Sequence, residues 1–318
     1  MAGRRTHRLA AAGIVLGSLI GATGSTGGVA DAQPTRSGEA TAAAAAPVVT
    51  GLEKRQSPVL GGDTDVKTVR AYCPGTKKVV GGGGLVQEAS TTDRIALTRL
   101  EPSDNADGFG RDGYIVSAAE TSPGVPGNWQ VQAFVMCADA ASVPGWHINP
   151  EFTDTTSSPQ DAIAAACDNG ATQRVIGTGA RAEVAAGAEG EVVLQVARAS
   201  GPGDIARAQS HEDANGFLGT HWLGAYAICM NTPKGYRVAP GGVSQQRLSE
   251  SHKFATVGCG TQQNLSAGGA ITDVAPGHVS LQSVFPTVTG AEVLAVENTP
   301  YNLNWDFIIA RAICVDKT

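Results

Sequence analysis

The residues best suited to chemistry gather in one stretch, His211-Glu212-Asp213, which His221 and Trp222 follow closely. Imidazole and carboxylate groups at this spacing can bind a metal ion or transfer protons in acid/base catalysis. The sequence has no G-x-S-x-G or similar turn that would activate a serine nucleophile. Polar histidines in loops are more commonly solvated than catalytic. We therefore name His211, Glu212 and His221 as binding candidates, and assign no catalytic residue.

Two loops resemble the first half of a calcium loop, because oxygen-bearing side chains alternate before a glycine. They are Ser103–Gly108 and His211–Gly216. Both lack the distal glutamate, and Tyr114 and Trp222 stand in its place. Asx turns explain the same pattern, so we expect no metal and no cofactor.

Paired carboxylates could hydrolyse a glycosidic bond, and four glutamates qualify by position. They are Glu101, Glu120, Glu212 and Glu297. The last three fall near the ends of matching strands in the repeats described below. A repeated site and a solvated strand end both fit, and the solvated end is favoured.

Aromatic rings can stack on sugars or anchor a partner. Trp129, Trp222 and Trp305 recur at similar places, so we interpret them as core residues. Trp146 stands outside this series and is a further binding candidate.

Three segments of the chain repeat one another, and each closes on a cysteine: Cys137, Cys229 and Cys314. Alternating apolar residues and frequent glycine predict short β-strands. We therefore expect an all-β fold of three related modules. The expected bounds are 63–140, 141–230 and 231–318. A β-prism with pseudo-threefold symmetry is our first choice, and three small β-sandwiches in tandem are the alternative.

Six cysteines allow fifteen pairings, and the repeat selects one. It predicts the disulfides Cys73–Cys137, Cys167–Cys229 and Cys259–Cys314. The cysteines are too widely spaced for a zinc site. The glycine clusters, such as Gly81–Gly84, predict bulges or close backbone approach, since no Lys-Ser/Thr follows as in a phosphate loop.

The N-terminal residues 1–32 have the order of a signal peptide, with basic residues, an apolar run and a small-residue cleavage site before Gln33. Residues 33–62 are rich in Ala, Pro and Gly and are expected to form a linker. The 318 residues hold 23 Lys/Arg and 29 Asp/Glu, a net charge of −6. Removing three Arg and one Asp with residues 1–32 makes it −8. The signal peptide predicts a secreted, extracellular protein, and the lack of a second apolar span predicts no membrane insertion. The acidic charge predicts no nucleic-acid partner.

The motif Cys73-Pro74-Gly75, the run Val79–Gly83 and the closing strand to Cys137 resemble tandem modules of secreted proteins from high-GC Gram-positive bacteria. The resemblance covers about residues 63–318 and implies an exported β-rich protein, with no activity to transfer. Cys167 and Cys259 depart from it because no proline follows them. The Cys-Pro and glycine motifs are also faintly similar to the vitelline membrane outer layer protein, whose fold is a threefold β-prism.

These observations favour a secreted, non-enzymatic binding or structural module whose partner is a glycan or another cell-surface polymer. The alternative is an extracellular hydrolase with its site in the second module. One deep cleft that gathers His211, Glu212 and His221 would favour the hydrolase.

Overall fold

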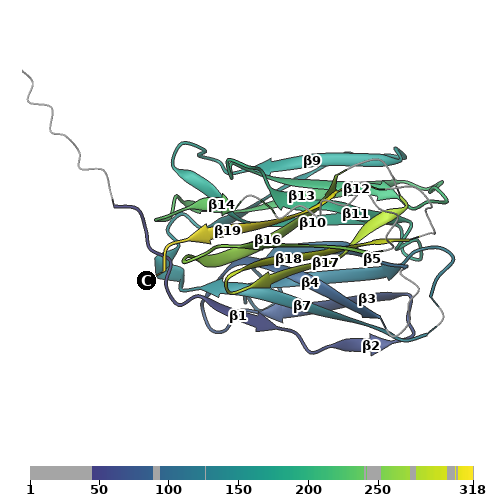
Figure 1. Cartoon of the computed structure of the whole chain (residues 1–318), viewed down its shortest axis with the longest axis horizontal. Coiled ribbons are helices and arrows are strands. Elements are labelled where there is room, and N and C mark those ends of the chain that lie inside the picture. The colour runs from purple at the N-terminus through teal and green to yellow at the C-terminus, as the bar shows by residue number, and fades with distance from the viewer. Residues whose placement is uncertain are drawn as a thin grey trace, which may run out of the picture. The chain divides into compact units, whose positions relative to one another are not determined.

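The regular secondary structure of the described residues is almost entirely β-strand. The computed structural model describes residues 45–88, 94–125, 127–239, 241, 252–272, 277–298, 305 and 307–317. The expected signal peptide, and the linker as far as residue 44, lie outside the described residues. Residues Ala45–Thr318 form one compact unit. Its strands lie roughly along one common axis (Figure 1), with neighbouring strands antiparallel, and one short 3-10 turn, Ala140–Ser142, lies among them.

Three sheets make up this unit, and we name them A, B and C. Sheet A contains β1 (Glu53–Gln56), β2 (Leu60–Gly62), β4 (Lys78–Glu88), β7 (Trp129–Ala138), β15 (His252–Gly258), β17 (Val279–Thr287) and β18 (Gly290–Glu297). Sheet B contains β3 (Val66–Tyr72), β5 (Ile95–Ser103), β6 (Gly113–Glu120), β8 (His147–Phe152), β10 (Gln173–Val184) and β13 (His221–Asn231). Sheet C contains β9 (Gln160–Ala166), β11 (Val192–Ala199), β12 (Ile205–Glu212), β14 (Arg237–Ala239), β16 (Gln263–Thr272) and β19 (Phe307–Val315).

Each sheet is built from two modules. In sheet B the order is β3-β6-β5 from the first module, followed by β10-β13-β8 from the second. Sheets A and C repeat this order with the other two pairs of modules. The middle strands β4, β10 and β16 come from different sheets and contact one another pairwise. The fold is therefore a β-prism with pseudo-threefold symmetry, and the alternative of three tandem sandwiches is wrong.

A short edge strand precedes the opening cysteine of each module and pairs with the module's closing strand. In β1, β8 and β14 the residues opposite the closing cysteines are Glu53, His147 and Arg237. The expected linker at 33–62 is therefore wrong over its second part, because β1 and β2 both pair with β7. These strands are too short to show an alternating pattern, so the sequence did not reveal them.

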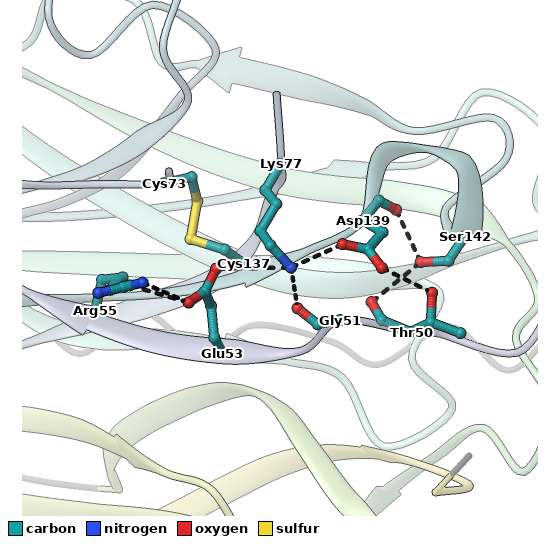
Figure 2. Close-up of polar contacts among 9 residues, drawn as sticks. All are labelled: Thr50, Gly51, Glu53, Arg55, Cys73, Lys77, Cys137, Asp139 and Ser142. Carbon is teal, nitrogen blue, oxygen red and sulfur yellow. Dashed lines mark hydrogen bonds and ion pairs between the residues drawn. A yellow bond between two sulfur atoms is a disulfide. The ribbon is translucent and has the colours of Figure 1, made fainter. Parts of the chain in front are cut away.

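Side chains fasten this first edge strand to its module (Figure 2). The Lys77 ammonium lies 2.7 Å from Asp139 Oδ1 and also donates to the Gly51 carbonyl. The Thr50 hydroxyl donates to Asp139 Oδ2 at 3.1 Å. Hydrogen bonds from Lys77 and Thr50 hold the pKa of the Asp139 carboxyl below its usual value. These contacts lie next to the Cys73–Cys137 disulfide and join residues 50–51, just before β1, to the first module.

All three predicted disulfides are confirmed: Cys73–Cys137, Cys167–Cys229 and Cys259–Cys314. Each closes a loop that spans a whole module, and the chain-entropy model assigns about 4 kcal/mol to loops of this size. Each bridge also joins the two sheets to which its module contributes. Three disulfides indicate folding in an oxidising compartment.

The predicted close approach at glycines is confirmed. Gly177 follows a β-bulge, and a Cβ there would lie 2.4 Å from the Val80 carbonyl oxygen of the neighbouring sheet. Gly83 would place a Cβ 1.9 Å from the Val284 carbonyl oxygen. Glycine is needed at both positions because the backbones of different modules meet there.

The tryptophans divide into two groups. Trp129 and Trp305 are fully buried, as expected for core residues. Trp222 is half-buried on the outer face of sheet B, so its expected core position is wrong. Trp222 lies one residue closer to its closing cysteine than Trp129 does, and a shift of one residue turns a strand side chain to the other face. His221 occupies the core position instead.

Candidate functional site

Trp146 lies in the joint between the first two modules. It is half-buried, and its indole Nε1 donates to the Val79 carbonyl oxygen at 2.7 Å. The Lys78 ammonium lies 4.2 Å from a Trp146 ring centroid. Tyr236 makes the equivalent contact one module later, donating to the Val175 carbonyl oxygen at 2.8 Å. These contacts explain Trp146 by packing.

His211 and His221 do not share a cleft. His211 is on the outer face of sheet C, where its Nε2 lies 3.0 Å from Gln209 Nε2. Burial lowers the pKa of the His211 imidazole to about 4. His221 is buried on the inner side of sheet B, with Nε2 3.2 Å from Asp161 Oδ2. Successive strand residues face opposite sides, so Glu212 points away from His211. The gathering expected of a hydrolase site is absent.

The repeated glutamates support loops. Glu120 accepts a hydrogen bond from Trp129 Nε1 at 2.9 Å and another from the Val125 backbone at 2.6 Å. Glu212 accepts a hydrogen bond from the Phe217 backbone at 3.1 Å. Glu297 is 9% exposed. The interpretation as solvated strand ends is therefore wrong, because these carboxylates are partly or largely buried and two of them fix the loop that follows.

The calcium-like loops are Asx turns in the structure, as favoured. The Asp107 carboxylate accepts hydrogen bonds from the backbones of Phe109 and Arg111. Asp213 accepts one from the Asn215 backbone at 3.0 Å. Within the described part of the chain, no group of three or more His, Cys, Asp or Glu is arranged to hold a metal ion.

A surface that the sequence did not single out is the best candidate for a functional site. It is the outer face of sheet B, which we call the sheet B platform. Its members are Arg99, Glu101, Phe152, Arg181, Glu183, Trp222 and Tyr226.

One half of the sheet B platform is aromatic. Phe152 is 50% exposed and meets two rings edge to face, with centroids 5.3 Å from Trp222 and 5.9 Å from Tyr226. Gly224 lies opposite Phe152 in the register and leaves room for the ring. Burial, and then the negative charge of Glu101, raise the pKa of the Tyr226 hydroxyl, so the side chain stays neutral. The result is an apolar shelf on a surface that faces solvent.

The other half is a network of paired charges. Arg181 Nε lies 2.7 Å from Glu183 and its Nη1 lies 3.5 Å from Glu101. Arg99 Nε lies 2.6 Å from Glu101. Burial alone would lower the pKa of Arg181, but the hydrogen bond to Glu183 and the charge of Glu101 outweigh this and raise it. The Arg181 guanidinium also lies 5.1 Å from the Trp222 ring, which links the two halves.

A cavity of about 180 Å³ opens beside this network. Arg99, Arg181 and Glu183 line it together with Thr68 and Ser117, whose hydroxyls are 2.8 Å apart. A second hollow of about 620 Å³ shares Val66 and Glu189 with the first. The platform thus offers an aromatic shelf, fixed polar groups and a recess.

The sequence held a signal for this surface. Arg99 and Glu101 are two residues apart, as are Arg181 and Glu183, so each pair lies on one face of its strand. The pairing of β5 with β10 brings Arg181 opposite Arg99. That pairing joins two modules, and the repeat alone did not predict it.

Comparison with models of known protein families finds no match, and comparison with curated proteins finds none either. No helix among the described residues is long and apolar enough to cross a membrane. The functional assignment therefore depends on the chemistry of the surface itself.

Proposed function

We propose that this protein is a secreted, non-enzymatic module that binds a glycan of a cell surface or extracellular polymer through the sheet B platform. One observation carries the proposal: the aromatic pair Trp222–Phe152 lies next to the ion pair Arg181–Glu101, and Arg181 also lines a cavity.

The chemistry of a sugar ring matches both halves of the platform. A pyranose has an apolar face of C–H groups and a rim of hydroxyls that donate and accept hydrogen bonds. An aromatic ring beside polar groups offers the same two kinds of contact. The side chains of Arg181 and Glu101 already hold each other in place, so a ligand orders few groups when it binds.

Charge balance favours an uncharged polar ligand. The arginines of the platform are paired with glutamates at 2.6 to 3.5 Å. A neutral sugar can share these groups through hydrogen bonds, whereas an anion would have to compete with the carboxylates. The acidic balance of the whole chain also disfavours nucleic acid.

Secretion is part of the proposal. The order of residues in 1–32 and the three disulfides support export to an oxidising compartment. The hydrolase alternative draws less support, because His211 lies on a different face from Glu212 and His221, and His221 is buried.

A screen of the chain from residue 33 onward tests the proposal. The disulfide-intact protein is applied to a glycan array and mixed with insoluble polysaccharides in pull-down assays. We expect retention on at least one neutral glycan, and competition by its soluble fragments. Absence of binding across both formats would overturn the proposal. Release of reducing sugar from the bound polymer would favour the hydrolase.

A further inference from the structure

Three arginines form a row on the outer face of sheet C. Arg198 on β11 lies directly opposite Arg207 on β12. On the other side Gly268 of β16 stands next to Arg198, and Arg311 of β19 lies opposite Gly268. The strands β12, β11, β16 and β19 are neighbours in this order. The row therefore crosses four strands of the sheet.

The glycine brings two of the arginines together. A Cβ at Gly268 would lie 2.8 Å from Arg198 Cα, so no side chain fills the space between Arg198 and Arg311. The inner face of the same strands carries alanines, including Ala197 and Ala310, which are at most 2% exposed. The arginines thus project from the outer face, where Arg207 is exposed and the other two are half-buried.

The charges of this row are not balanced. No ion pair to a carboxylate is formed by Arg198, Arg207 or Arg311 in the described part of the chain. The Nε atoms of Arg198 and Arg311 are buried and have no hydrogen-bond partner among the described residues. Burial, then the charges of Arg311 and Arg207, lower the pKa of Arg198. An unpaired cluster of like charges is costly to a fold, and it contrasts with the paired arginines of sheet B.

We propose that this row, Arg207–Arg198–Arg311, is an oxyanion-binding site for a phosphate or sulfate group. A guanidinium presents a planar fork of N–H donors that matches the oxygens of such a group, and adjacent forks can bind one anion together. A bound oxyanion supplies the missing acceptors for the buried Nε atoms and offsets the repulsion. This site lies on a different sheet from the sheet B platform and does not depend on the proposed glycan site.

Thermal unfolding in the presence of anions tests the site. The probes are inorganic phosphate and inorganic sulfate, with citrate as a carboxylate, each compared with sodium chloride at equal ionic strength. We expect phosphate or sulfate to raise the melting temperature of the protein above the chloride curve. A rise in melting temperature with citrate alone would indicate a site for carboxylates and would overturn the assignment to a phosphate or sulfate group.

Three variants make the test specific. Arg198→Gln and Arg207→Gln each remove one charge of the row, and Arg70→Gln removes an exposed arginine elsewhere. We expect the first two to weaken the anion response at least about tenfold in concentration, and Arg70→Gln to keep it. Without anions, Arg198→Gln should melt no lower than the wild type, because it relieves repulsion. Arg207→Gln keeps the test valid if Arg198→Gln fails to fold, since Arg207 is exposed. Equal responses in all three variants would overturn the proposal.

Discussion

His221 Nε2 lies 3.2 Å from Asp161 Oδ2, and this buried pair takes the place of a lysine and a tryptophan in the first module. There Lys67 lies 3.4 Å from the Trp129 ring centroid. Lys67 and Asp161 are equivalent, because they lie opposite Ala118 and Ser210. These two residues each pair with the last residue before the bulge of the next strand, Leu97 or Leu194. The second module has therefore exchanged a cation and an aromatic ring for a carboxylate and an imidazole.

The Asp161 pair should contribute little stability at neutral pH. Burial raises the pKa of Asp161, and the charge of His221 offsets this only in part. A carboxyl group whose pKa is higher in the folded state than in the unfolded state lowers the free energy of unfolding at pH values above its folded pKa. It has no such effect at pH values below its unfolded pKa. Asp161→Asn should therefore leave the free energy of unfolding unchanged or raise it by about 1 kcal/mol at pH 7, with no gain near pH 3. Urea unfolding at both pH values measures this. A loss above about 2 kcal/mol at pH 7 would show a stabilising pair.

Trp129→Phe should destabilise the fold by about 2–4 kcal/mol. The change leaves a cavity beside Lys67 and removes the donor to Glu120 Oε1. Trp222→Phe is the matched control, because Trp222 is half-buried and has no such acceptor among its contacts. It should change stability by less than about 1 kcal/mol. Equal losses in the free energy of unfolding of the two variants, measured by chemical denaturation, would show that the two tryptophans have the same role.

The repeat, the disulfides and the core alternation of β7 could be predicted from the sequence because each is local or recurs three times. The exchange of strands between modules could not, since pairs such as Val284 with Gly84 join residues far apart in the chain. The sheet B platform was missed for a related reason. Trp222 matches Trp129 in residue type, but a shift of one residue reverses the face of a strand. The row of arginines was missed because its members lie on three separate strands.

Gly83→Ala should disrupt the fold, because a Cβ would lie 1.9 Å from the Val284 carbonyl oxygen. The backbone cannot move away there without separating β4 from β17. We therefore expect the free energy of unfolding to fall by more than about 3 kcal/mol, or no folded product to form. Gly258→Ala is the control, since its nearest neighbour would be 3.9 Å away. It should change stability by about 1 kcal/mol or less. Comparable soluble yields and melting temperatures for the two variants would contradict the close approach.

The second module should not fold alone. Residues 141–230 contain β8 to β13, which form half of sheet B and half of sheet C. Cutting the chain there exposes the inner faces of both halves and removes their partner strands. We expect the isolated segment to show no cooperative urea transition by circular dichroism, even with Cys167–Cys229 oxidised. A cooperative transition would show that the modules are independent domains.

The most direct test of the glycan site compares Trp222→Ala with Gln130→Ala on whichever neutral glycan the screen identifies. Gln130 takes the equivalent place on the closing strand of sheet A, opposite Gln87, as Trp222 lies opposite Glu183. Isothermal titration should show at least about tenfold weaker binding for Trp222→Ala, because a stacking ring at a binding surface contributes about 1.4 kcal/mol or more. Gln130→Ala should bind as the wild type does. Unchanged affinity in Trp222→Ala would contradict the assignment of glycan binding to the sheet B platform.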